Sequence, residues 1–560
     1  MFRPLLLLGL LSTSAVALAQ TTPAPAPAPA MTPAQENAQS NAVLPADQAA
    51  MKAHVMFLAS DAMHGREAGS DEYNVAANYV ASQFYAAGLR PMGTDGSYLQ
   101  TVPLVSFKAA GEGSFALNRS GAQPLAFGTD YVPSPNPASA NTAITAPVVF
   151  VGYGIDAPSE GRNDYAGVDV KGKIVAYFGG APAALNGEVR AHLGSGATKA
   201  AMASAKGAVG VIQIESPVTA KVRPFSRLVD GYDHSRMTWA NPDGTGHLSA
   251  AGTPALGTLS LAGAEKLFAG AKTPWASVMA LASDDAAKFK AEQLPGTMTV
   301  NLVTEIKPVT SYNVAGLLEG SDPKLKEEVV VLTAHLDHVG VGKAVNGDTI
   351  YNGAMDNAVG IASMIEEAKR FKAAGTPPKR SILFLAVTAE EKGLVGSDYF
   401  ANNPTIPKER LVANVNLDMP IITYKFQDVI AFGAERSTLG TYVRNAAQKL
   451  GVTFSPDPMP EQGLFVRSDH YRFVQQGIPS VFLWPGTAGP GKAAVDAFFA
   501  THYHQPSDEI VQGPPIDWES GVRFIEANYM IAREIADAPQ RPAWKKGDFF
   551  GTLYKGYGAK

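Results

Sequence analysis

The chain has 560 residues, of which 46% are hydrophobic and 17% are charged, and its net charge at pH 7 is −5. This composition is typical of globular proteins, the length indicates two or more domains, and the weak negative charge argues against nucleic acid or an anionic membrane as a partner. The sequence contains no cysteine. Disulfides, thiolate nucleophiles and cysteine-based zinc sites are therefore excluded, and any metal site must use His, Asp and Glu.

The N-terminus has the pattern of an export signal. Arg3 precedes an apolar run that starts at Leu5, and Ala17-Leu18-Ala19 places small residues at the −3 and −1 positions of a cleavage site before Gln20. We predict a cleaved signal peptide over residues 1–19 and a periplasmic or secreted protein with no stable membrane insertion after cleavage. The alternative is an uncleaved anchor, for which the apolar run is short.

Three further regions precede the main part of the chain. The Pro-Ala alternation within residues 20–44 favours extended conformations and predicts a disordered linker. Residues 45–110 place apolar side chains at spacings of three and four, which predicts helices. Residues 111–300 contain short β-rich runs, such as APVVFVGYGI and GAVGVIQIES, separated by Gly, Pro and Asp, which indicates a mostly β domain.

Residues 301–536 alternate between strand and helix patterns, whereas the tail at 537–560 has no clear pattern. Runs such as EVVVLTA are apolar throughout, which is typical of strands buried on both faces of a largely parallel sheet. The predicted fold class is α/β, with a helix-covered, mostly parallel sheet and a β-rich insertion. The predicted strands are 313–318, 328–335, 381–388, 412–418, 428–433 and 479–484. The predicted helices are 357–373, 393–402, 437–450, 468–476 and 517–536.

Polar side chains stand where three of these strands stop. His335 ends one strand, Glu390 and Glu391 end the next, and Asp418 ends a third. Because ligands bind outside the carboxyl ends of the strands in open α/β sheets, we expect these side chains to meet at one rim.

Two residues outside the strands complete the set. Asp356 lies just before a predicted helix, and His504 lies in a loop before the last long helix. Two zinc ions about 3.5–4 Å apart need about five His, Asp and Glu ligands, plus one uncoordinated carboxylate that accepts a proton from water. The candidate ligands are His335, Asp356, Glu391, Asp418 and His504, which leaves Glu390 as the base.

Each candidate also has an ordinary structural explanation. Paired glutamates mostly lie on solvated surfaces, an aspartate before a helix is mostly an N-cap, and a single histidine is more often structural than a ligand. We assign His338, His470 and His502 to structural roles. Asp337, two residues after His335, is expected to accept the other ring N–H of that histidine and so orient it. The set stands out because all its members fall at strand ends or helix starts of one domain.

The motifs TAHLDH, GAMDNAVGIASMIE, TAEEKGLVGSDYF, VNLDMP, SDHYRFVQQGIPSVF and YHQPSDE together resemble the di-zinc exopeptidases related to bacterial leucyl aminopeptidases and glutamate carboxypeptidase. The resemblance spans about residues 310–535. It implies that His335 and Asp418 hold one zinc, that Glu391 and His504 hold the other, and that Asp356 bridges them.

The resemblance also implies roles for residues around the ligands. Glu390 would be the general base, with Asp337 behind the first histidine, and Tyr503 would support the oxyanion. The peptide bond between Asp356 and Asn357 is a candidate for the cis form. The runs DYAGVDVKGKIVAYFGG and AKGAVGVIQIES resemble a protease-associated domain, and residues 45–110 resemble the N-terminal part of the peptidase domain, which would then be discontinuous.

The predicted function is an exported exopeptidase with two Zn²⁺ per chain, an aminopeptidase that releases N-terminal residues from peptide substrates. A carboxypeptidase or dipeptidase on the same scaffold is the first alternative, in which Arg467 could grip a substrate carboxylate. A glutaminyl cyclase-like transferase, which typically keeps one zinc, and a non-catalytic binding module are the others. Cobalt or manganese can occupy similar ligands, and no oligomeric state is predicted.

Overall fold

The computed structural model describes residues 32–560, except residues 186, 223, 251, 285–287 and 512. The signal peptide predicted at 1–19 lies outside the described residues. The chain divides into two compact units, residues 1–42 and 43–560, and the described part of the first contains helix α1 (Pro33–Ser40). This helix lies within the segment predicted as a disordered linker, because the Pro-Ala alternation stops before it and Ala, Gln and Glu favour helix.

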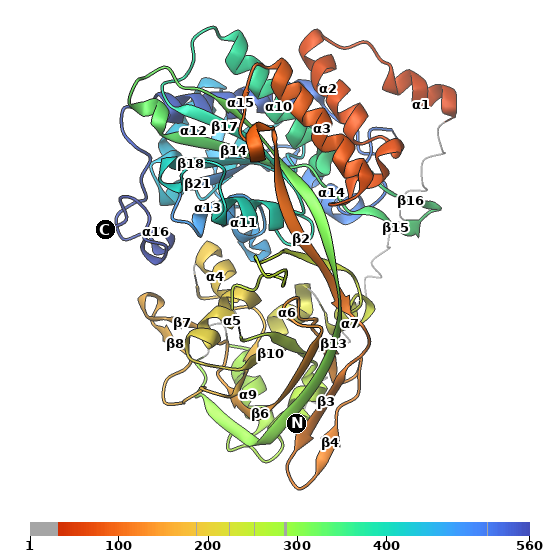
Figure 1. Ribbon diagram of the computed structural model, residues 1–560, viewed down its shortest axis with the longest axis vertical. Coiled ribbons are helices and arrows are strands. Elements are labelled where there is room, and N and C mark those ends of the chain that lie inside the picture. Colours follow the sequence, from red (N-terminus) through yellow and green to blue (C-terminus); the bar gives the residue numbers. More distant parts are fainter. Residues whose placement is uncertain (1–31, 186, 223, 251, 285–287, 512) are drawn as a thin grey trace, which may run out of the picture. The chain divides into compact units, whose positions relative to one another are not determined.

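Four parallel strands form the middle of the first of two sheets in the second unit (Figure 1). They lie in the order β17 (Ser381–Val387), β14 (Val329–His335), β18 (Leu411–Leu417) and β21 (Ser480–Pro485). Every residue in these strands is buried, as expected for strands that are apolar along their whole length. The predicted α/β class with a mostly parallel sheet is confirmed.

Antiparallel strands extend this first sheet on both sides. Next to β21 lies β19 (Asp428–Phe432), which pairs in turn with β20 (Thr453–Ser455). Next to β17 lies the end of β13 (Glu292–Leu318), which also pairs with β1 (Arg90–Pro91) and β2 (Leu99–Ala109). Strand β11 (Arg236–Trp239) pairs with β2.

The 27-residue strand β13 was not predicted as one element. The sequence pattern predicts a domain boundary at residue 300 and a separate strand at 313–318. A proline cannot donate to a ladder, but Pro308 does not end the strand. In the structure Pro308 lies opposite Val105 and the register with β2 is continuous. The strand belongs to two sheets, pairing at its start with the strands of the second.

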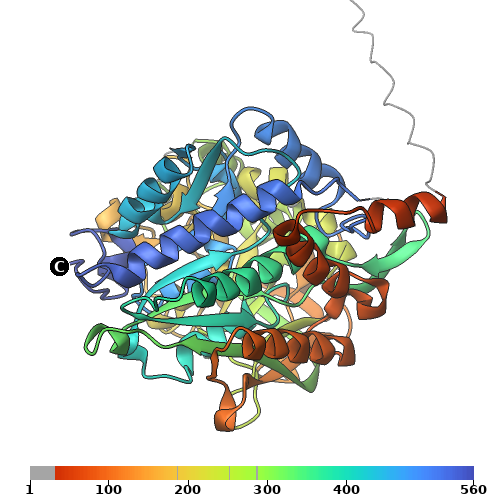
Figure 2. The same cartoon turned by 90° about the horizontal axis from the view of Figure 1, so that it is seen from above.

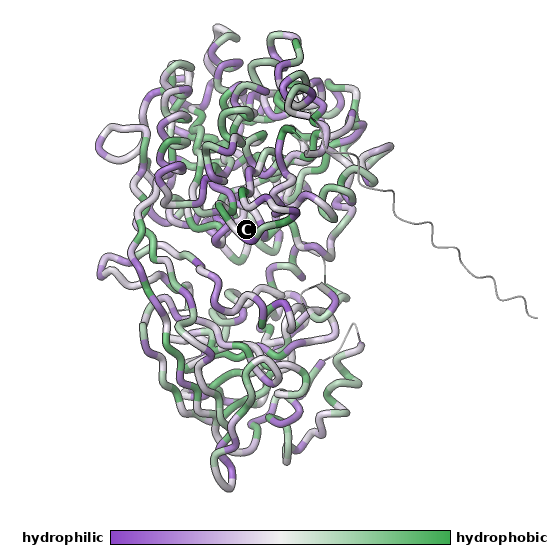
Figure 3. The backbone as a smooth tube through the Cα atoms, turned by 90° about the vertical axis from the view of Figure 1, so that its right-hand side faces the viewer, coloured by the Kyte–Doolittle hydropathy of each residue, from purple (hydrophilic) through white to green (hydrophobic). Residues whose placement is uncertain are grey.

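Helices cover both faces of the first sheet (Figures 1 and 2). One face carries α2 (Ala46–Leu58), α3 (Asp71–Ala86), α10 (Val359–Ala373), α12 (Leu439–Lys449) and α15 (Trp518–Asp537). The other carries α11 (Val395–Asn402) and α13 (His470–Val474). Helix α14 (Gly491–Thr501) was not predicted. Figure 3 shows hydrophobic residues along the inner strands and helices and mostly hydrophilic ones in the outer loops.

The second sheet lies in the segment predicted to be mostly β. Its parallel strands are β6 (Asn141–Phe150), β9 (Ile174–Phe178), β10 (Gly210–Ile214) and β12 (Ala255–Leu259). Its antiparallel pairings involve β3 (Ser114–Asn118), β4 (Ala122–Pro124), β5 (Tyr131–Pro133) and the start of β13. That this segment is a protease-associated domain stays a prediction.

The remaining elements are short. The helices near the second sheet are α4 (Gly187–Gly194), α5 (Gly196–Ala205), α6 (Pro217–Val222), α7 (Phe225–Asp230), α8 (Leu261–Phe268) and α9 (Trp275–Ala282). Two hairpins are formed by β7 (Asp156–Ala157) with β8 (Arg162–Asn163) and by β15 (Gly340–Val345) with β16 (Asp348–Tyr351).

The C-terminal tail, which has no clear sequence pattern, is ordered around two buried aromatic residues. Helix α16 (Phe549–Leu553) contains the buried Phe550, and the indole N–H of the buried Trp544 donates to the Gly477 carbonyl at 2.8 Å. Across the described residues, no helix combines the length and the apolar character that crossing a membrane requires.

Candidate metal centre

Four of the predicted residues lie at the carboxyl ends of the parallel strands. His335 is the last residue of β14, and Asp418 directly follows β18. Glu390 and Glu391 follow β17 after a short turn. Parallel strands end at one edge of the sheet, so these side chains reach the same rim, as the sequence pattern predicts.

Asp356 reaches this rim from an irregular turn, Ala354–Ala358, immediately before α10. The peptide bond between Asp356 and Asn357 is cis, as predicted. The buried Asp508 carboxylate holds the turn, because its two oxygens accept the main-chain N–H groups of Met355 at 2.9 Å and Asp356 at 3.0 Å. Asp508 was missed by the sequence analysis. The available signal was an acidic residue shortly after His504 in the same loop.

Asn357 ties the Asp356 turn to the strand that carries Asp418. Its side-chain oxygen accepts the Met419 N–H at 3.1 Å, and its side-chain NH₂ donates to the Leu417 carbonyl at 2.9 Å. Because Leu417 and Met419 flank Asp418, these bonds set the distance between the two aspartates.

The Asp356 carboxylate lies between two histidines, with one oxygen facing each. His335 Nε2 is 3.2 Å from Asp356 Oδ1 and 3.0 Å from Asp418 Oδ1. His504 Nε2 is 3.2 Å from Asp356 Oδ2 and 3.0 Å from Glu391 Oε2. The structure thus brings all five predicted ligands together, in two groups that share Asp356.

His338, which the sequence analysis assigned to a structural role, also lies in this centre. Its Nδ1 is 2.7 Å from Glu391 Oε1 and 4.0 Å from Asp356 Oδ2. The ring is fully buried, so within the described residues its Nδ1 faces the Glu391 carboxylate away from solvent. The signal that could have identified His338 is its place in HLDH, one residue after the aspartate.

We call the whole set the strand-end cluster. Two triads within it each present one ligand atom per residue, and within each triad these atoms lie within 4.8 Å of one another. The triads are His335, Asp356, Asp418 and His338, Asp356, Glu391. The full cluster consists of His335, His338, Asp356, Glu390, Glu391, Asp418 and His504.

Asp337 supports the cluster in a different way from the one expected. His335 Nδ1 lies 3.1 Å from the main-chain carbonyl of Asp337, so the ring is oriented by the backbone of this residue. The Asp337 carboxylate instead accepts the main-chain N–H groups of Glu390 at 3.0 Å and Glu391 at 3.3 Å. The side chain therefore positions the turn that carries both glutamates.

Arg66 places a buried positive charge behind the cluster. Its side chain is 1% exposed and donates to the carbonyls of Leu336 at 3.0 Å, Asn352 at 2.6 Å and Gly353 at 3.1 Å. Burial lowers the pKa of Arg66 to about 10, against the opposing effect of nearby carboxylates such as Asp337. Sequence reasoning missed Arg66 because its partners lie far along the chain.

The electrostatics of the cluster favour positive charge beside its carboxylates. Burial raises the pKa of Glu390 well above its usual range, and the Asp418 and Glu391 carboxylates raise it further, although His335 opposes this. Burial alone would lower the pKa of His335, but Asp418 and Glu390 raise it well above its usual value. Four close carboxylates in a low-dielectric site require compensating positive charge, which a divalent metal ion supplies.

Tyr503 and Arg467 lie beside the cluster, on the wall of a cavity of about 40 Å³. The Tyr503 ring stacks on His504 with 3.9 Å between ring centroids, and its hydroxyl accepts from Arg467 Nη2 at 3.3 Å. Apolar side chains also line this cavity, namely Met419, Leu464, Phe482, Trp484 and Phe499.

The two other histidines considered above belong to neither triad. His470 is buried between the rings of Phe465 and Phe482. His502 Nδ1 lies 3.0 Å from the Ser507 hydroxyl.

Residues 313–531 match the model of peptidase family M28. Leupeptin-inactivating enzyme 1 from Streptomyces exfoliatus is 32% identical over 209 residues, which cover 37% of this chain and 42% of that protein. Aminopeptidase YwaD from Bacillus subtilis (strain 168) is 30% identical over 206 residues, which cover 36% of this chain and 40% of that protein. The chain thus spans about two fifths of the length of these relatives.

One solved structure with a similar chain is the aminopeptidase from Aneurinibacillus sp. strain AM-1. It is 21% identical with a TM-score of 0.48, and the similarity covers 88% of this chain and 95% of that chain. The matched family region contains β14, β17, β18 and β21 and every residue of the strand-end cluster. The similarity to peptidase family M28 thus covers the part of the chain that carries the whole strand-end cluster.

Proposed function

We propose that the protein is an exported zinc aminopeptidase that binds two Zn²⁺ and releases N-terminal residues from peptides. The observation that carries this proposal is the position of Asp356, with one carboxylate oxygen facing His335 and the other facing His504. The similar proteins include an aminopeptidase, which supports the activity. They also include proteins named as probable zinc metalloproteases, which supports the metal.

The donor set fits zinc. His335, Asp356 and Asp418 would hold one ion, and Asp356, Glu391 and His504 would hold the other. His338 places a further nitrogen beside the second group. Imidazole nitrogens and carboxylate oxygens are the zinc ligands that remain when cysteine is absent, and the buried His338, grouped with Asp356 and Glu391, fits such a site. When bound, zinc supplies Lewis-acid activation of the carbonyl and of water.

The chain's own residues then handle the proton. Glu390 accepts a proton from the attacking water and passes it to the leaving amine, for which a pKa raised by burial is suited. Asp337 holds Glu390 in place through the main-chain N–H group. The Tyr503 hydroxyl, at the cavity wall, donates a hydrogen bond to the developing oxyanion.

One observation favours the carboxypeptidase alternative. Arg467 Nη2 lies 3.3 Å from the Tyr503 hydroxyl at the same cavity. A guanidinium there can bind a substrate's terminal carboxylate with two parallel hydrogen bonds. If this alternative is correct, Arg467→Met should raise KM about 10-fold or more for substrates with a free carboxylate and leave KM for amidated peptides unchanged.

The deciding experiment uses the purified protein from residue 20 onward and its Glu390→Gln variant. We would measure zinc content by mass spectrometry and amino-acid release from peptides with free or acetylated N-termini. About two zincs per chain, cleavage of free N-termini only, and a roughly 10²–10⁴-fold lower kcat in Glu390→Gln with zinc retained are expected. Cleavage of acetylated peptides would identify a carboxypeptidase, and a protein with neither zinc nor turnover would contradict both functions.

Export requires its own measurement. Mass spectrometry of the mature protein recovered outside the cytoplasm should give a chain that begins at Gln20. Recovery of the full-length chain in the membrane fraction would instead show an uncleaved anchor.

A further inference from the structure

We propose that a cavity beside the second sheet binds a small zwitterion, either a free amino acid or a short peptide. The cavity has a volume of about 620 Å³ and is bounded by β5, β10, β12, α7 and β11. We call it the second-sheet cavity, and it shares no residue with the strand-end cluster. Its size falls within the range of ligand sites, which commonly occupy about 300–1,000 Å³.

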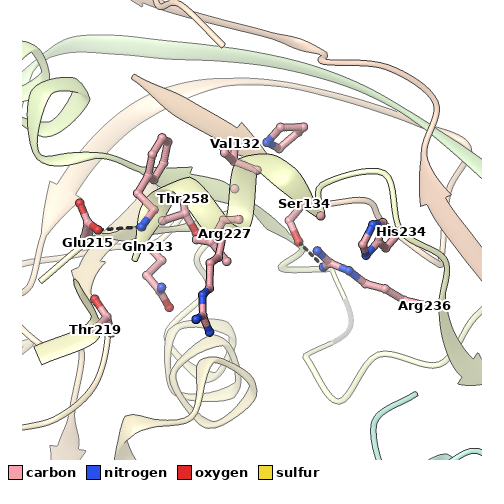
Figure 4. A pocket seen from close by; sticks show the side chains of 14 residues that line it. Val132, Ser134, Gln213, Glu215, Thr219, Arg227, His234, Arg236 and Thr258 are labelled. Atoms are coloured by element: carbon pink, nitrogen blue, oxygen red, sulfur yellow. Dashed lines mark hydrogen bonds between the residues drawn. The ribbon is translucent and has the colours of Figure 1, made fainter. Parts of the chain in front are cut away.

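The floor of the cavity is a row of side chains that crosses three strands. Gln213 on β10 lies opposite Thr258 on β12, and Thr258 lies opposite Val132 on β5. Residues in register on neighbouring strands project from the same face of a sheet, and all three line the cavity (Figure 4). An amide and a hydroxyl therefore stand on the cavity face of the sheet, where they can hydrogen-bond a ligand.

The charges around the floor are separated by sign. Figure 4 shows Glu215 on one side of the cavity, Arg236 and His234 on the other, and Arg227 between them. One oxygen of Glu215, which follows β10, accepts the main-chain N–H of Phe225 at 2.9 Å, and this bond fixes the carboxylate. Arg236 Nη1 lies 3.5 Å from the Ser134 hydroxyl.

Arg227 is the strongest indication of a ligand. It comes from α7 and lines the cavity, and within the described part of the chain its guanidinium has no recorded hydrogen bond or ion pair. Glu215 likewise accepts the Phe225 amide but forms no recorded ion pair among the described residues. Arg227 and Glu215 thus face a common space without a recorded ion pair between them, and Arg236 adds a second guanidinium to the lining.

This arrangement selects the chemistry of the ligand. The arginine fork matches the geometry of a carboxylate, and the fixed Glu215 carboxylate matches an ammonium group on the opposite side. A free amino acid or a short peptide carries both of these charges, and in a peptide Gln213 and Thr258 can hydrogen-bond the peptide group between them. An exopeptidase consumes and releases this class of molecule, but the argument for the cavity does not depend on that activity.

The test is calorimetric titration of the full chain carrying Glu390→Gln, so that peptides are not hydrolysed. The probes are Leu-Leu, N-acetyl-Leu-Leu, Leu-Leu amide and inorganic phosphate. Arg227→Met with Arg236→Met removes the carboxylate partners, Glu215→Gln removes the ammonium partner but keeps an acceptor for Phe225, and Arg90→Met is the control at an exposed arginine outside the cavity.

Leu-Leu should bind about 10-fold or more weakly to the double arginine variant and to Glu215→Gln than to the Arg90→Met control. Glu215→Gln should leave the affinity for N-acetyl-Leu-Leu unchanged, because that probe lacks the ammonium group. Equal Leu-Leu affinity in all variants would overturn the proposal, as would phosphate binding as tightly as Leu-Leu. Because binding is read without turnover, loss of peptidase activity and loss of this site are separate results.

Discussion

The strand-end cluster and the second-sheet cavity both gather charged side chains near the carboxyl ends of parallel strands, but they differ in burial. In the cluster, His335 and Asp356 are 1% and 4% exposed, and the carboxylates of Asp356, Asp418 and Glu391 each lie within 3.2 Å of a histidine nitrogen. In the cavity, Arg227 and Arg236 are exposed and stand apart from Glu215. Buried charges have lost their hydration and must be compensated by fixed partners, whereas exposed charges can exchange water for a soluble ligand.

The largest expected effect is the loss of folding stability when a buried charge beside the strand-end cluster is removed. Arg66→Met should destabilise the fold by about 3–5 kcal/mol, because it leaves buried carboxylates without a cation and several carbonyls without a donor. Urea unfolding of the metal-free protein measures this cost without a contribution from bound ions. The exposed Arg90→Met is the matched control, and equal stability of both variants would show that Arg66 does not compensate the cluster.

A smaller effect is expected from the residue that positions the glutamates. Asp337→Asn keeps the size of the side chain but offers only one strong acceptor to the N–H groups of Glu390 and Glu391. Zinc affinity should fall about 10–100-fold, as for other residues behind metal ligands. Competition with a chelator measures the affinity, and Asp348→Asn in the exposed β15–β16 hairpin should match the wild type.

A third prediction concerns a buried carboxyl group far from both sites. Glu367 in α10 is fully buried, its two oxygens have no hydrogen-bond partner within the described residues, and burial raises its pKa to about 8 against the opposing effect of Arg370. A pKa that is higher in the folded chain than in the unfolded chain stabilises the fold at low pH. That contribution is complete below about pH 4.5 and is lost as pH rises through about 8.

Glu367→Gln removes this titration. The melting temperature of the variant should therefore exceed that of the wild type by a margin that grows from pH 5 to pH 9. The neighbouring Glu366 is the control with the opposite sign. Burial opposes its ionisation, but hydrogen bonds from His54 and Lys369 lower its pKa. Glu366→Gln should therefore lose stability relative to the wild type above about pH 4.5. If the stability of both variants and of the wild type changes with pH in the same way, the pKa shifts assigned to Glu367 and Glu366 are contradicted.

The smallest effect on folding stability is expected when an exposed charge of the second-sheet cavity is removed. Arg227→Met should change the unfolding free energy by no more than about 0.5 kcal/mol, because the side chain is solvated and has no recorded partner. Urea unfolding under the conditions used for Arg66→Met makes the two arginines directly comparable. A loss as large as that of Arg66→Met would mean that Arg227 is part of the fold and not a ligand contact.

The parallel strands and their helices agree with the sequence prediction to within about two residues, as for 328–335 against the observed Val329–His335. Their apolar runs are fully buried, so local pattern and tertiary environment coincide. The prediction is wrong where the local sequence pattern and the tertiary environment differ. Strand β13 continues through Pro308, and helix α14 was not predicted.

The sequence by itself determined the α/β class and placed His335, Asp356, Glu391, Asp418 and His504 at element ends, because periodicity and strand termini are local properties of the chain. Only the tertiary structure decided what surrounds them. Arg66 meets Leu336 across 270 residues, and His338 meets Glu391 where the neighbouring strands β14 and β17 end. Such contacts depend on which elements become neighbours and on how deeply charge is buried, and neither is encoded in a short window of sequence.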